Sequence, residues 1–239
     1  SISVNDNIKS FFTIFPGYTP VTENFSGNTS VLKNFAKALN NAKNGKVRIA
    51  HFGDSVIEGD LISADLRKNL QSQFGGSGVG FVAVNSPDIA FRTTTRLSYS
   101  DNWKYGAVFA SNSDKLPVGL NGAVAYTNGN SWVNYEPYGL YGIKQFHSAK
   151  LYYQSDAGGN ITVGTNTAGE KTFTLKGSKK IEELDLGLSG RVKNVKITIP
   201  AGTKGNFYGV SFEEGNGIYV DNYPLRGNSG IALRDIPES

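Results

Sequence analysis

Apolar residues near the start of the chain recur first at helical spacing and then in a short run. The helical spacing is seen at Leu32, Phe35, Ala38, Leu39 and Ala42. Asn28 or Thr29 can cap the start of this helix, and Gly45 can end it. The run over 47–52 is short and mostly apolar and contains one arginine, which is consistent with a buried strand. The pattern therefore predicts a helix followed by a strand.

A second helix is predicted over 61–73, because apolar residues again fall on or near one face. These residues are Leu61, Ala64, Leu66 and Leu70. Gly75 and Gly76 end the segment, whereas residues 1–28 contain breakers and are expected to be irregular. The order helix, strand, turn, helix favours an α/β unit with a parallel sheet.

The second half of the chain has a different pattern, with short alternating runs about ten residues apart and turn residues between them. The runs cover 150–154, 160–164, 171–176, 181–188, 192–199 and 207–212. This spacing predicts an all-β sandwich, jelly-roll-like in character. The sequence has no fixed-period repeat, which argues against a propeller or a solenoid.

A strand-like segment over 217–223 and a loop over 224–230 follow the sandwich pattern, and 231–236 could start another helix. This return to the first pattern makes the β region an insertion. The expected domains are an N-terminal part of the α/β domain (1–92), an inserted β-sandwich (93–214) and a return to the α/β domain (215–239).

Composition narrows the possible functions. The net charge is +4, and the lysines and arginines are scattered, so the stripe of positive charge typical of nucleic-acid binding is missing. No apolar run approaches the roughly 20 residues that span a bilayer. The absence of cysteine excludes disulfides, thiolate catalysis and cysteine-based metal sites. The absence of methionine indicates that Ser1 is either a processed N-terminus, its signal peptide removed, or an artificial boundary.

The residues that end the first predicted strand have the pattern of a nucleophile turn. Gly53 allows a tight turn, and Ser55 falls where a helix N-terminus is expected. Backbone amides at such a position can stabilise a developing oxyanion. The G-x-S-x-G elbow is absent, but a strand-to-helix turn carrying a serine follows the same logic.

Residues 51–55 resemble the first block of the SGNH, or GDSL-type, serine hydrolase family, and 226–230 are similar to its second block. The resemblance implies that Ser55 is the nucleophile and that Asp54 supports it. It also implies an oxyanion hole made by the amides of Ser55 and Gly230. The implied fold is an SGNH-like parallel-sheet α/β unit, incomplete at its C-terminus and interrupted by the inserted sandwich.

The stretch after the first block is also similar to bacterial family members that carry an inserted β domain. The residues are Asp60, Leu66-Arg67, Leu70, Phe74-Gly75, Gly78 and Gly80-Phe81-Val82. Some of these members remove O-acetyl groups from peptidoglycan or other polysaccharides.

The chain lacks two of the family's elements, a Gly-x-Asn block and a C-terminal Asp-x-x-His. Its only histidines are His51 and His147. Alternation along a strand turns His51 away from Ser55, so we expect it to be a packed strand residue. His147 would need the insertion to fold back over the site. We therefore expect the catalytic histidine and asparagine on a segment downstream of Ser239 or on a separate fragment, and we expect no metal site or cofactor.

Aromatic residues gather among glycines and asparagines over 126–141. Such rings can stack on sugars, which makes Trp132, Tyr135 and Tyr138 candidate carbohydrate-binding residues. The alternative, which we favour, is that the rings fill the sandwich core and its covering loops.

The leading hypothesis is a secreted or periplasmic bacterial serine esterase that removes O-acetyl groups from a polysaccharide or peptidoglycan. Water as the acyl acceptor gives an esterase, and a sugar hydroxyl gives an O-acetyltransferase. The competing hypothesis is a non-catalytic carbohydrate- or surface-binding protein that keeps the α/β frame without the triad.

Overall fold

The computed structural model describes residues 30–85, 91–108 and 112–236. The chain divides into two compact units, 1–41 and 42–239. The described part of the first unit contains helix α2 (Val31–Asn41), which confirms the first predicted helix. Its expected caps, Asn28 and Thr29, lie outside the described residues.

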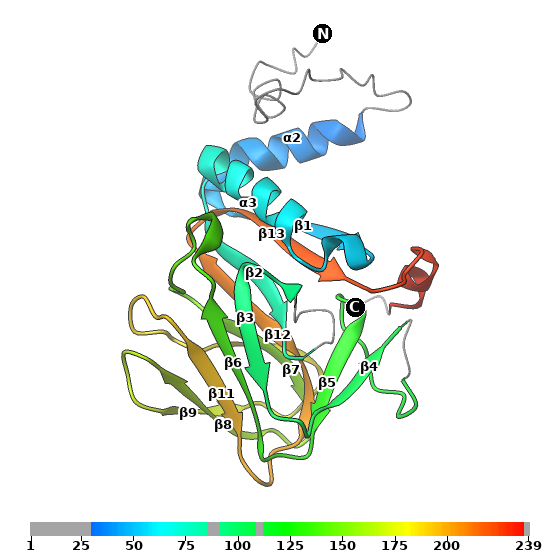
Figure 1. The fold of residues 1–239 in the computed structure, drawn as a ribbon, viewed down its shortest axis with the longest axis vertical. Coiled ribbons are helices and arrows are strands. Elements are labelled where there is room, and N and C mark those ends of the chain that lie inside the picture. The colour runs from blue at the N-terminus through cyan, green and yellow to red at the C-terminus, as the bar shows by residue number, and fades with distance from the viewer. Residues whose placement is uncertain (1–29, 86–90, 109–111, 237–239) are drawn as a thin grey trace. The chain divides into compact units, whose positions relative to one another are not determined.

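The second unit contains a parallel pair of strands, β1 (Lys46–Gly53) and β13 (Gly217–Pro224), in a register that pairs Lys46 with Gly217 and Gly53 with Pro224. Helix α3 (Leu61–Phe74) lies along one face of this pair (Figure 1). Three short 3-10 helices flank these elements: η2 (Ala42–Asn44), η3 (Ser55–Ile57) and η6 (Ile231–Asp235). The predicted strand, second helix and returning strand are therefore confirmed. In the described ranges, no helix is both long enough and apolar enough to span a membrane.

Two antiparallel sheets form the β-sandwich. The first runs β10 (Ser178–Asp185), β7 (Lys150–Ser155), β12 (Gly205–Glu214), β5 (Ala123–Thr127), β4 (Lys104–Ala107), with β2 (Ser77–Ala83) also paired to β12. The second runs β3 (Thr95–Tyr99), β6 (Ser131–Pro137), β11 (Val195–Ile199), β8 (Gly159–Thr165), β9 (Lys171–Leu175). A further short helix, η5 (Leu140–Gly142), follows β6. A small α/β part and an inserted sandwich are thus both present, as the sequence predicted.

The sandwich core lies between the two sheets and is rich in aromatic rings. Phe146 stacks on Phe212 with ring centroids 3.9 Å apart, and Tyr135 meets Phe212 edge-on at 5.3 Å. Each fully buried large side chain of this kind contributes roughly 1.5–3 kcal/mol. The space between the two sheets therefore holds the main hydrophobic core of the second unit.

Strand β2 joins the sandwich, although the sequence placed its residues in the first α/β segment. Its glycines are required by close backbone approach: a Cβ on Gly78 would lie 2.2 Å from the Phe212 carbonyl oxygen, and one on Gly80 would lie 2.4 Å from Asp221 Oδ1. Because β2 follows α3 and pairs with β12, it connects the two parts. The expected domain bounds stay a prediction.

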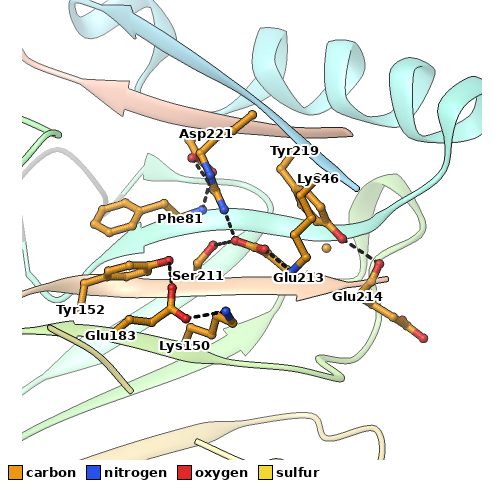
Figure 2. Close-up of polar contacts among 12 residues, drawn as sticks. Lys46, Phe81, Lys150, Tyr152, Glu183, Ser211, Glu213, Glu214, Tyr219 and Asp221 are labelled. Atoms are coloured by element: carbon orange, nitrogen blue, oxygen red, sulfur yellow. Dashed lines mark hydrogen bonds and ion pairs between the residues drawn. The ribbon is translucent and has the colours of Figure 1, made fainter. Parts of the chain in front are cut away.

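The junction between the parallel pair and the first sheet is a layer of charge. Lys46 Nζ lies 2.6 Å from Glu213 Oε2, and Arg48 bonds both Glu213 and Asp221. Figure 2 shows Lys46, Glu213 and Asp221 at this junction, with Ser211 also donating to Glu213. Burial acts to raise the pKa of Glu213, but Lys46, Ser211 and Arg48 outweigh it and lower that pKa to about 2. Glu213 is therefore held ionised.

A second charged cluster surrounds Asp60, which is fully buried at the start of α3. Its carboxylate accepts hydrogen bonds from Arg67 at 3.0 and 3.2 Å and from Thr94 at 2.5 Å, and it lies 3.2 Å from Arg92. Burial acts to raise the pKa of Asp60, but Arg92 and Arg67 outweigh it and hold the pKa below its usual value. Arg67 also donates twice to the Val220 carbonyl of β13, at 2.9 and 2.8 Å. The cluster therefore joins α3 to the parallel pair.

Replacing Asp60 with asparagine should strongly destabilise the protein. The change leaves Arg67 and Arg92 buried without their carboxylate, which costs about 3–5 kcal/mol for a buried pair. Urea unfolding followed by circular dichroism measures the loss. Asp114→Asn is the matched control, because Asp114 pairs with Lys104 on the surface and its removal should barely move the midpoint. Equal midpoints for the two variants would contradict the role given to Asp60.

The contribution of Glu213 to stability should depend on pH. Its pKa in the folded state is about 2 against an ordinary 4.5, so its contribution is complete above pH 4.5 and is lost as the pH falls towards 2. Glu213→Gln should therefore lower the free energy of unfolding by about 3 kcal/mol at pH 7. The difference in the free energy of unfolding between Glu213→Gln and the parent protein should become smaller as the pH approaches 2.

Urea unfolding at a series of pH values measures this gap, with the exposed Glu170→Gln as the control. A gap between parent and Glu213→Gln that stays constant down to pH 2 would rule out the linkage.

Candidate active site

The turn after β1 presents Ser55 to solvent. Asp54 has extended backbone (φ −89°, ψ −152°), and its carboxylate accepts the Val56 N–H at 3.0 Å. The Glu58 N–H donates to the Ser55 carbonyl at 3.2 Å, which closes the 3-10 turn. A Cβ on Gly53 would lie 3.0 Å from Ile57 Cδ1, so the turn is tight. Ser55 is exposed at the carboxyl end of a parallel strand, the edge at which α/β proteins place ligands.

The loop that leaves β13 is fixed to this turn. The Leu225 N–H donates to the Gly53 carbonyl at 2.9 Å. Arg226 forms a bidentate pair with Glu58, through Nε at 2.7 Å and Nη2 at 2.6 Å. The Glu58 side chain is only 7% exposed, so this pair lies largely out of solvent on the Glu58 side. The two segments that resembled hydrolase blocks are therefore joined in space, and Figure 1 shows the red C-terminal segment beside the turn after β1.

Gly230 lies at the end of the same loop, with positive φ (89°) and an exposed position. Its N–H donates to Asn228 Oδ1 at 2.8 Å. A role in an oxyanion hole requires this amide to leave Asn228 and face the substrate. That role, like the nucleophilic role of Ser55, stays a prediction.

His51 belongs to a polar chain on the α3 side of β1. Its Nδ1 lies 2.7 Å from Ser63 Oγ, Ser63 donates to Asn222 Oδ1 at 2.9 Å, and Asn222 Nδ2 donates to the Ile57 carbonyl at 2.8 Å. Since the Ser63 proton goes to Asn222, the Nδ1 of His51 must carry a proton and donate. The geometry assigns His51 to packing beneath the turn, as expected.

His147 lies far from Ser55. Its Nδ1 is 4.0 Å from Glu214 Oε1. Glu214 ends β12, three residues before β13 begins at Gly217. Ser55 follows Gly53, which pairs with the last residue of β13. Eight residues of strand separate these ends, roughly 25 Å at about 3.3 Å per residue. His147 is therefore too far from Ser55 to deprotonate it, and in the described part of the chain His51 bonds Ser63 and not Ser55.

The three aromatic candidates lie in different environments. Tyr135 is completely buried, packs against Phe212, and donates its hydroxyl to the Ala83 carbonyl at 3.3 Å. Its ring fills the core and is closed to a ligand. Trp132 is partly exposed beneath Lys196, and Tyr138 is 52% exposed beneath Arg96. Carbohydrate binding by Trp132 and Tyr138 stays a prediction.

Sequence reasoning missed the polar pairs that hold the site. Arg67 lies seven residues, about two helical turns, after Asp60, which is the N-cap residue of α3. That spacing was a usable signal. The pairing of Arg226 with Glu58 spans 168 residues and has no local pattern.

Arg226→Ala should release the loop after β13 from the Ser55 turn, because it removes both bonds to Glu58. Amide hydrogen exchange over 225–230 should become about ten- to a hundredfold faster. Arg234→Ala is the control, since Arg234 pairs only at the surface with Asp235. Unchanged exchange in Arg226→Ala would show that other contacts fix the loop.

No family model matches the chain, and no curated protein matches it. It is similar to the solved structure of a peptidoglycan O-acetylesterase, with 20% identity and a TM-score of 0.60, over 85% of this chain and 54% of that one. A family two carbohydrate esterase from Cellvibrio japonicus matches at 8% identity and a TM-score of 0.38, over 61% of this chain and 36% of that one.

A family 29 carbohydrate binding module matches at 8% identity and a TM-score of 0.36, over 59% of this chain and 88% of that module. The scores of the esterase from Cellvibrio japonicus and of this module are too low to support an argument. The chain spans about half the length of the peptidoglycan O-acetylesterase. Over that span, it shares the fold of a peptidoglycan O-acetylesterase.

Proposed function

We propose that this chain forms the nucleophile-bearing part of an SGNH-type serine esterase that removes O-acetyl groups from a polysaccharide or peptidoglycan. One observation carries the proposal: Ser55 is exposed at the carboxyl end of β1 in a turn fixed by the Asp54 cap and the Glu58–Arg226 pair. The fold shared with a peptidoglycan O-acetylesterase supports it.

The reaction is a two-step acyl transfer. Ser55 Oγ attacks the acetyl carbonyl, its proton passes to a base, and the ester C–O bond breaks with the sugar hydroxyl as leaving group. Water then attacks the acetyl-serine and releases acetate. The amide of Ser55, at the first position of η3, and that of Gly230, once freed from Asn228, stabilise the oxyanion.

The base in this proposal is a histidine supplied by a further segment of the same protein, because the His51 ring bonds Ser63 on the α3 side of β1 and His147 lies at the far end of β13. The substrate class places the protein outside the cytoplasm, secreted or periplasmic. No residue role in the proposal calls for a cofactor.

The position of the two histidines also favours a second function, a carbohydrate-binding protein without catalysis. In that case Ser55 would be dispensable, and binding to insoluble polysaccharide would be the activity.

Ser55→Ala should abolish acetyl release, lowering the rate by about a thousandfold or more, because the acyl-accepting hydroxyl is gone. Acetate release from an O-acetylated polysaccharide and turnover of p-nitrophenyl acetate measure it, using the protein at its full natural length. Ser72→Ala is the control, since Ser72 is exposed on α3 and bonds only its own helix. Equal rates for parent and Ser55→Ala would refute the enzyme and leave the binding function.

Intact mass spectrometry of the active protein tests the source of the base. A mass above 25.7 kDa, or a second co-purifying fragment, is expected. Full, Ser55-dependent activity from a 25.7 kDa chain alone would contradict the proposal that the base is a histidine on a further segment.

A further inference from the structure

A pocket of about 190 Å³ opens between the parallel pair and the first sheet of the sandwich. Four aromatic residues, one arginine and one asparagine are among those that line it: Phe81, Tyr152, Tyr208, Tyr223, Arg48 and Asn121. We call it the Asn121 pocket. Asp221 also lines it, and Figure 2 shows the ring of Phe81 near that of Tyr152, with their centroids 6.2 Å apart.

The tyrosine hydroxyls of the pocket are already engaged by the protein. Tyr152 donates to Glu183 at 2.8 Å, Tyr208 to Gln154 at 3.0 Å, and Tyr223 to Asp221 at 3.2 Å. A ligand in the pocket would therefore meet the edges and faces of these rings and not their hydroxyl groups. A Cβ on Gly119 would lie 2.6 Å from the Tyr208 ring, so a glycine is needed for the backbone to pack against it.

Asn121 supplies the polar function. It lies in a turn fixed by two bonds, Gly122 N–H to the Gly119 carbonyl at 2.8 Å and Gly119 N–H to the Ala123 carbonyl at 3.1 Å. Asn121 is 8% exposed, and among the described residues its Oδ1 has no hydrogen-bond partner. An unpartnered buried oxygen is costly, so a donor from a ligand would satisfy it.

The charges beside the pocket are balanced. Arg48 and Lys46 face the carboxylates of Glu213 and Asp221, two positive charges against two negative. Arg48 is thus committed to protein partners and is not free to recruit an anion. A neutral ligand suits this electrostatic environment better than a phosphate or a carboxylate.

We propose that the Asn121 pocket binds one neutral sugar ring, with aromatic residues against its C–H faces and Asn121 Oδ1 accepting a hydroxyl or amide proton. The pocket is smaller than the 300–1,000 Å³ or so typical of drug-sized ligands, so it admits a single ring. The inference rests on the proposed function in one respect, that the ring belongs to the polysaccharide substrate. The ring of Phe52, three residues before Ser55, packs against the ring of Tyr223 with centroids 5.1 Å apart. The pocket therefore adjoins β1, the strand that leads into the serine turn.

Calorimetric titration of Ser55→Ala tests the proposal without hydrolysis. The probes are neutral oligosaccharides of glucose, mannose, xylose and N-acetylglucosamine, with oligogalacturonate as the charged comparison. We expect at least one neutral probe to bind, and Asn121→Ala in the same background to weaken it about fivefold or more, the effect of one hydrogen bond. Asn194→Ala is the matched control, because Asn194 Oδ1 is also buried without a partner in the described residues but lies beside the second sheet.

Leu120→Trp provides a second variant that does not depend on core packing. Leu120 is 61% exposed at the pocket, so an indole there should narrow the entrance and reduce binding while thermal unfolding stays unchanged. If no neutral probe binds, if only oligogalacturonate binds, or if Leu120→Trp and the parent bind equally, the proposal is overturned. Acetate release by the Ser55 protein is measured separately, so failure of the pocket and failure of the esterase are distinguishable.

Discussion

The carboxylate of Asp60 is fully buried, and it is stable there because Arg67, Arg92 and Thr94 surround it. Each arginine also donates to backbone carbonyls. Arg67 reaches Val220 in β13, and Arg92 reaches two carbonyls of β2. One buried charge therefore fixes the start of α3, the parallel pair and a sandwich strand relative to one another. Removing the carboxylate would leave both arginines buried without their anionic partner.

The position of Ser55 follows from this cluster. The chain has only four residues between the serine and Asp60, and they are held at both ends. Thr93 donates twice to the Gly59 carbonyl, at 3.1 Å from its N–H and 2.8 Å from its hydroxyl. A turn fixed in this way holds the backbone at Ser55 in a defined place, which is what the proposed nucleophilic role requires of it.

The sequence predicted those elements whose pattern is local and contiguous, namely β1, α3, β13 and the strands after residue 149. It did not resolve β2 to β6. Gly78 and Gly80 break the apolar run of β2, and they are required because their φ angles are positive and because Phe212 and Asp221 approach from distant strands. The pairing of the buried charges was not predicted from the sequence, for the same reason. Asp60 meets Arg92 across 32 residues of sequence, a pairing that periodicity does not encode. For the candidate active site, the sequence therefore predicted Ser55, Asp54 and Gly230 but not the buried charges that hold the segments around them.

Strand β13 explains how the candidate site and the pocket can share one scaffold. Alternation sends Val220 and Asn222 towards α3, and Asp221 and Tyr223 towards the sandwich. Asn222 bonds the Ile57 carbonyl beneath the Ser55 turn, whereas Asp221 and Tyr223 line the pocket. A strand buried on both faces normally carries apolar residues throughout. Strand β13 instead carries hydrogen-bonded polar side chains on both faces. The same strand therefore positions residues at the Ser55 turn and at the Asn121 pocket.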